Sequence, residues 1–76
     1  MTHHVLDVRN LLCPMPVIKL QNLIARLSSG DTVDVQATDP GVLQDIPAWC
    51  RINGHEVLTT STTARELLLT VRVKAA

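Results

Sequence analysis

The stretch VLDVRNLLCPMPVIKLQNLIARLSSGDTVDVQAT, residues 5–38, changes its hydrophobic period twice. Residues 5–8 place Leu6 and Val8 on one face and Asp7 on the other, the period of a half-buried strand. From residue 14 to residue 29 apolar side chains recur at the spacing of an amphipathic helix, which Gly30 stops. Residues 32–38 alternate again. This stretch predicts strand, helix and strand, with inward-facing Val17, Leu20, Ile24 and Leu27 on the helix and Val33, Val35 and Ala37 on the second strand.

The second half of the chain predicts another helix and two more strands. Asp39 and Pro40 are typical of an N-cap and a first helical residue, and Asn53-Gly54 closes the segment. Pro47 predicts an interruption, after which the helix restarts with Asp45 as its cap. Residues 56–60 and 66–73 have strand-like patterns, and residues 61–64 are long enough to join them as a hairpin.

The predicted fold class is therefore α+β. The element order β-α-β-α-β-β indicates a two-layer sandwich, in which a four-stranded mixed sheet carries both helices on one face. Seventy-six residues suffice for one small domain, so we expect a single domain over residues 1–76.

Charge and composition exclude several classes of function. Seven Lys and Arg balance seven Asp and Glu, so no basic field is available to attract a nucleic acid or an anionic membrane. The N-terminal residues lack a signal-peptide pattern, and no apolar stretch reaches the length of a membrane span. We therefore expect a cytoplasmic protein that is a monomer when free.

Cys13 stands where the first strand gives way to the first helix. With Pro14 as the first helical residue, Cys13 becomes the N-cap, and Met15 supplies the main backbone donor because Pro16 has no N–H. A helix N-terminus lowers the pKa of a cysteine thiol, which predicts an exposed and reactive Cys13. Pro14 and Pro16 stiffen the turn, and Met15 points outward. The alternative is a buried thiol that serves only as a small apolar side chain.

Two blocks of sequence resemble one known family. Leu6-Asp7, Leu11 and the run Cys13-Pro14-Met15-Pro16-Val17 resemble the signature of the TusA/SirA family, in which a Cys-Pro-x-Pro turn opens the first helix. The second block comprises Asp39-Pro40, Asp45-Ile46-Pro47-Ala48-Trp49-Cys50 and Gly54-His55-Glu56. The resemblance implies a carrier that holds sulfane sulfur as a persulfide on Cys13, supported by Pro14, Met15 and Pro16.

Two positions depart from that family. Asn10 stands where Gly is frequent, and Asn tolerates the positive φ that such a turn requires. Leu12 stands where a polar or basic residue is frequent, so the chain lacks a cation directly before Cys13. Arg9 is close enough in sequence to compensate, although a solvated surface arginine is its ordinary role.

The remaining thiol and the histidines favour structural roles. Cys50 falls beside Trp49 on the apolar side of the second helix, which favours a core thiol over a second sulfur site. His3, His4 and His55 show no paired spacing with the cysteines, so we expect no metal and no other cofactor.

The resemblance also implies the partners. A donor, either a cysteine desulfurase or a rhodanese, would load the carrier, and a relay protein would accept the sulfur for tRNA thiolation or for dissimilatory sulfur oxidation. Because such a carrier acts only with its partners, the sequence leaves open whether the protein is itself an enzyme. The alternative is a regulatory binding module that transfers no sulfur. A thiol oxidoreductase is disfavoured because no resolving cysteine stands next to Cys13.

Overall fold

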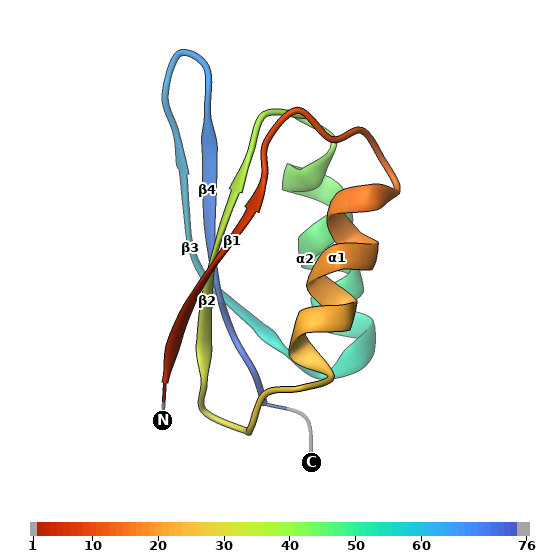
Figure 1. Cartoon of the computed structure of the whole chain (residues 1–76), viewed down its shortest axis with the longest axis vertical. Coiled ribbons are helices and arrows are strands. Elements are labelled where there is room, and N and C mark those ends of the chain that lie inside the picture. Colours follow the sequence, from red (N-terminus) through yellow and green to blue (C-terminus); the bar gives the residue numbers. More distant parts are fainter. Residues whose placement is uncertain (1, 75–76) are drawn as a thin grey trace.

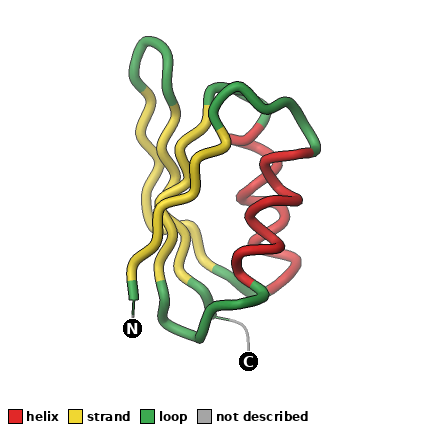
Figure 2. Tube along the Cα trace, in the orientation of Figure 1, coloured by secondary structure: helices red, strands yellow, loops and turns green. Residues whose placement is uncertain are grey.

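The computed structural model describes residues 2–74, which form a sheet with two helices on one of its faces (Figures 1 and 2). The elements follow the predicted order: β1 His3–Val8, α1 Met15–Ile24, β2 Thr32–Ala37, α2 Val42–Asn53, β3 Glu56–Thr62 and β4 Leu67–Arg72. The predicted two-layer α+β fold is confirmed. Within residues 2–74, neither helix is long and apolar enough to cross a bilayer.

The sheet is mixed, with strand order β1-β2-β4-β3. β1 pairs in parallel with β2, while β4 pairs antiparallel with both β2 and β3. A parallel pair cannot be joined by a tight turn, and α1 provides the crossover from β1 to β2. The arrangement leaves β1 and β3 at the edges and brings β2 and β4 to the centre.

The core lies between the central strands and the two helices. The side chains of β2 and β4 alternate between buried and less buried positions, because successive residues of a strand face opposite sides of the sheet. α1 contributes Leu20 and Ile24, and α2 contributes Val42, Ile46 and Cys50. Burial confirms the inward-facing residues predicted for β2, namely Val33, Val35 and Ala37.

The first helix is shorter than the sequence pattern predicts. It ends at Ile24, and the N–H groups of Arg26 and Leu27 bond to the carbonyls three residues earlier, at 2.9 and 3.0 Å. This tighter winding is common at the ends of α-helices. Leu27 still packs against the core, so the apolar period continues although the α-helix does not.

The predicted break at Pro47 is wrong, because α2 is continuous from Val42 to Asn53. Proline removes one backbone donor and disfavours a helix interior by roughly 3 kcal/mol. Ile46 and Cys50 on either side of Pro47 are buried, and this packing offsets the lost bond. Asp45 is therefore a first-turn residue of α2 and not the cap of a second segment. The cap position belongs to Gly41, and Asp39 accepts the Gly41 N–H through its side chain at 3.1 Å.

Asn10 turns the chain at the end of β1. Its φ is +66°, in the left-handed region that Asn tolerates better than most residues. The Asn10 N–H donates to Oγ1 of Thr38 at 2.8 Å, which joins this turn to the end of β2. The structure confirms the positive φ predicted at this position.

Candidate functional site

Cys13 lies in the loop between β1 and α1, at the end of the molecule where α2 begins (Figure 1). Its side chain is exposed. The thiol donates to Oδ2 of Asp45 at 3.1 Å, and the Cys13 backbone N–H donates to Oδ2 of Asp39 at 3.2 Å. One carboxylate from the segment before α2, Asp39, and one from the first turn of α2, Asp45, therefore hold the cysteine loop.

The predicted N-cap role of Cys13 is wrong. α1 begins at Met15, Pro14 occupies the cap position, and no side chain caps the helix. The Met15 N–H bonds to the carbonyl of Leu12 at 2.9 Å, so it is not free to bind the Cys13 sulfur. Pro16 is the second helical residue and is buried, which anchors the start of α1 in the protein. Cys13 thus precedes the helix by one residue more than the sequence indicated.

The predicted lowering of the Cys13 pKa is also wrong. The hydrogen bond to Asp45 raises the pKa of the thiol, and desolvation and the charges of Asp45 and Asp39 act in the same direction. A carboxylate next to a thiolate disfavours the second negative charge. Arg9 does not compensate, because its guanidinium bonds to Asp7 at 2.9 Å and to Glu66 at 3.3 Å.

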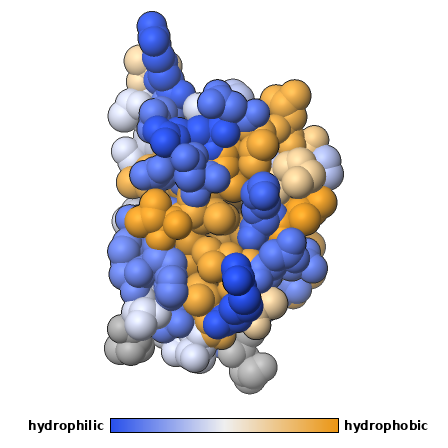
Figure 3. Space-filling view, in the orientation of Figure 1, coloured by the Kyte–Doolittle hydropathy of each residue, from blue (hydrophilic) through white to orange (hydrophobic). Residues whose placement is uncertain are grey.

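Exposed apolar side chains occur along the segment that carries Cys13. Leu12 is 74% exposed, and Met15 and Ile18 at the start of α1 are 40% and 41% exposed. Leu43 in the first turn of α2 is exposed as well. Figure 3 shows apolar surface over the upper part of α1 and the segment before it. We call Leu12, Met15, Ile18 and Leu43 the apolar rim. These side chains are exposed and available for apolar contact, and Met15 is exposed as the sequence predicted.

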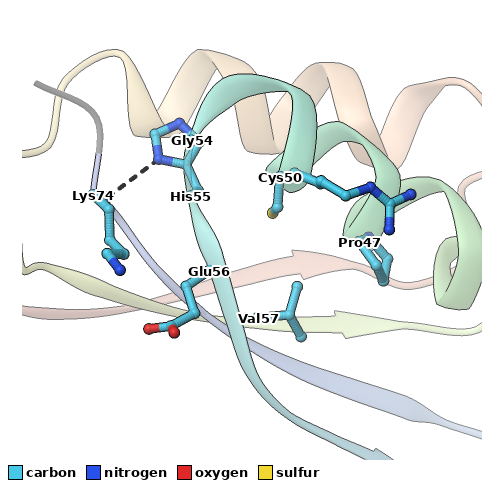
Figure 4. Close-up of a pocket in the computed structure, with 8 residues that line it drawn as sticks. Pro47, Cys50, Gly54, His55, Glu56, Val57 and Lys74 are labelled. Carbon is cyan, nitrogen blue, oxygen red and sulfur yellow. Dashed lines mark hydrogen bonds between the residues drawn. The ribbon is translucent and has the colours of Figure 1, made fainter.

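Cys50 belongs to the core, as predicted. It is 1% exposed, and burial raises the pKa of its thiol to about 11. Its sulfur faces an open cavity of about 400 Å³ at the C-terminal half of α2, to which His55, Glu56 and Lys74 also contribute (Figure 4). Cys13 is not among the residues that line this cavity. A buried thiol of raised pKa is a poor nucleophile.

The two thiols should therefore differ in reactivity. We expect iodoacetamide at pH 7 to alkylate Cys13 at least about tenfold faster than Cys50, because Cys13 is exposed, whereas Cys50 is buried and its thiol pKa is raised to about 11. Peptide mass spectrometry after timed quenching measures both rates in one sample. Equal rates, or a faster Cys50, would contradict the assignment of Cys13 as the reactive thiol.

The histidines have other partners. His3 bonds to Thr32 and Asp34, His4 bonds to Thr2, and His55 accepts the Lys74 N–H and stacks on Trp49 with ring centres 5.2 Å apart. Over residues 2–74, no three His, Cys, Asp or Glu side chains are grouped so that they could hold a metal ion.

Sequence reasoning missed the roles of Asp39 and Asp45 at the cysteine. The sequence pattern indicates helix caps at both positions, yet Asp39 and Asp45 lie 26 and 32 residues from Cys13 in sequence and contact it in space. The available signal was topological: a β-α-β-α order on one sheet face can bring the starts of both helices to the same end of the molecule.

Known proteins share both the sequence and the fold. The family model for the sulfurtransferase TusA matches residues 4–73. The sulfur carrier protein TusA of Pseudomonas aeruginosa (strain LESB58) is 41% identical, and the match covers 99% of each chain. The putative sulfur carrier protein YrkF of Bacillus subtilis is 41% identical over 56 residues, which are 74% of this chain and 30% of that relative. The crystal structure of a SirA-like protein from Desulfitobacterium hafniense superposes with a TM-score of 0.82 at 19% identity, covering 93% of this chain and 97% of that one, which shows the fold alone. The chain therefore belongs to the TusA family of sulfurtransferases.

Proposed function

We propose that this protein is a sulfur carrier that holds sulfane sulfur as a persulfide on Cys13 and passes it from a donor protein to an acceptor protein. The observation that carries the proposal is the exposure of Cys13, in contrast to the buried Cys50. The relatives of the chain, named as sulfur carriers, support the same role.

The transfer requires no cofactor. The Cys13 thiolate attacks the terminal sulfur of a donor persulfide, the S–S bond of the donor breaks, and the donor leaves as a thiolate while Cys13 becomes the persulfide. In the second step an acceptor thiolate attacks the terminal sulfur on Cys13, and Cys13 leaves as a thiolate. Each step moves one sulfur with its proton and involves no net oxidation. Cys13 is thus the nucleophile in loading and the leaving group in unloading.

The residues around Cys13 would support the exchange. Pro14 and Pro16 restrict the backbone on the helical side of the cysteine, and the burial of Pro16 fixes that segment to the core. Met15 is half-exposed in the apolar rim, where its flexible side chain can adapt to more than one partner. A carrier must dock on at least two proteins, and such a surface suits that demand.

We propose a cysteine desulfurase or a rhodanese as the donor and a relay protein as the acceptor. The destination would be tRNA thiolation or dissimilatory sulfur oxidation in the cytoplasm. The carrier would not bind the tRNA itself, because its positive and negative side chains are balanced. We expect one chain to act as one domain and as a monomer between encounters.

The decisive test is intact-mass analysis after incubation with a cysteine desulfurase and cysteine. We expect the protein to gain the mass of one sulfur atom and to lose it on treatment with a reductant. No gain with several competent donors would exclude the carrier function and would favour a regulatory module that binds partners through the apolar rim.

A further inference from the structure

We propose that Asp45 holds the unloaded Cys13 as a neutral thiol, and that a productive partner activates the cysteine by placing a basic side chain against Asp45 and Asp39. This inference rests on the proposed function, because it describes how sulfur transfer on Cys13 is regulated. It makes Asp45 a positioning residue that acts through Cys13. It also gives the partner a definite chemistry, a cationic side chain surrounded by apolar contacts.

The geometry places both carboxylates against the cysteine. Oδ2 of Asp45 accepts the thiol proton at 3.1 Å, and Oδ2 of Asp39 accepts the backbone N–H of the same residue at 3.2 Å. A thiolate at this position would lose the hydrogen bond to Asp45 and face both negative charges, which agrees with the raised pKa of Cys13. The charged groups that act on the thiol are Asp45, in the first turn of α2, and Asp39, just before that helix.

Within residues 2–74, every resolved influence on the Cys13 thiol raises its pKa, and none comes from a cation. Leu12 directly before the cysteine is apolar, and the nearest cation in sequence, Arg9, is paired with Asp7 and Glu66. No ion pair among residues 2–74 involves Asp39 or Asp45. The neutralising charge must therefore come from another molecule. The exposed apolar rim would let a docked partner exclude water, and an electrostatic contact is stronger where water is excluded.

The same contact would control both steps of transfer. In the free protein little thiolate is present to attack a persulfide or an oxidant, and a loaded Cys13 is a poor leaving group because its thiolate is disfavoured. A partner cation next to Asp45 would stabilise the Cys13 thiolate. It would therefore favour both the attack of Cys13 during loading and its departure during unloading. The carrier would then accept and release sulfur when docked and keep it between encounters.

The first test compares the pH dependence of iodoacetamide alkylation at Cys13 in the wild type, Asp45→Asn and Asp45→Glu. We expect the Asp45→Asn profile to move to lower pH and its rate at pH 7 to rise about two- to fivefold, the range that an exposed charge interaction can produce. Asp45→Glu, which keeps the charge, should stay within about twofold of the wild type. In 1 M salt the wild-type rate should approach that of Asp45→Asn, because the screening length falls to about 3 Å.

The second test determines which charge is favoured next to Cys13. It uses two small disulfides of opposite charge, each of which reacts with a thiolate. Cys13 is reacted with cystamine, which carries two ammonium groups, and with dithiodiglycolate, which carries two carboxylates. The thiolate attacks one sulfur of the reagent and releases the other half as a thiolate. We expect the ratio of the cationic rate to the anionic rate to fall about two- to fivefold in Asp45→Asn. Comparing ratios removes the intrinsic difference between the reagents.

Asp34→Asn is the matched control, because Asp34 is an outward-facing carboxylate on the strand face opposite to the buried Val33 and Val35. It should change neither the pH profile nor the ratio. An unchanged profile in folded Asp45→Asn, or an unchanged ratio of rates, would overturn the inference. Both readouts are independent of persulfide loading, so a normal mass gain with an unchanged profile refutes only the role of Asp45, and a shifted profile without mass gain refutes only the carrier function.

Discussion

Cys13→Ser should abolish persulfide loading completely and leave the fold intact. The Cys13 side chain is exposed, and a serine hydroxyl can donate to Asp45 as the thiol does, so we expect the free energy of unfolding to change by less than about 0.5 kcal/mol. No sulfur is left at the position to form a persulfide. The measurement is intact mass after incubation with a cysteine desulfurase and cysteine, together with thermal unfolding of the same sample.

Cys50→Ser provides the matched control for this loss. Cys50 is buried, so a serine there places a hydroxyl in the core and should cost about 1–2 kcal/mol of stability. Loading should nevertheless proceed to one sulfur per chain. The two substitutions thus predict opposite outcomes for stability and for function. Loading that persists in Cys13→Ser and disappears in folded Cys50→Ser would assign the sulfur to the wrong cysteine.

Ile46→Ala should be the more damaging change for stability. Ile46 is fully buried in the core, next to Pro47 in the helix that presents Asp45 to the cysteine. Truncation of a buried isoleucine removes apolar contacts and leaves a cavity, which together cost roughly 2–4 kcal/mol. For a domain of this size the midpoint of thermal unfolding should fall by roughly 10–25 °C.

Ile52→Ala tests whether burial is the cause. Ile52 is in the same helix and is 81% exposed, so the same change of side chain should alter the unfolding free energy by less than about 0.5 kcal/mol. Denaturant titration of both variants gives the comparison directly. A similar loss in the two variants would contradict core packing as the cause, and helix propensity could not explain it, because Ala has a higher helix propensity than Ile.

Local patterns in the sequence predicted the helices and strands, because each pattern shows which side chains lie on the same face of an element. Alternation in residues 32–38 follows from the pleat of a strand, and the burial of Val33 and Val35 confirms it. The period of residues 14–29 identified the buried Leu20 and Ile24 but not the end of α1, because Leu27 packs inward after the helix has already tightened. A period fixes which side chains face the core more reliably than it fixes backbone geometry.

Long-range packing explains what the sequence could not reveal. Pro47 disfavours a helix locally, but the burial of Ile46 and Cys50 depends on strands that are distant in sequence. Likewise, the contact of Cys13 with Asp45 joins residues 32 positions apart. Reasoning from the helix N-terminus alone therefore gave the wrong direction for the pKa of Cys13. The position of that cysteine, before α1 and exposed, was correct because the Cys-Pro-x-Pro turn is a local feature.

The place of β4 between β2 and β3 also determines when a newly synthesised chain can become functional. On the ribosome, β1, α1 and β2 emerge first, but β2 lacks one neighbour until residues 67–72 have followed. Contacts between distant segments form late because their loop-closure entropy must be offset by packing that is not yet available. The packing of α2 against the core would then be among the last features to form. The contact between Asp45 and Cys13 would form with it. Until β4 is inserted, the nascent chain would carry its cysteine without the neighbouring carboxylate that disfavours the thiolate.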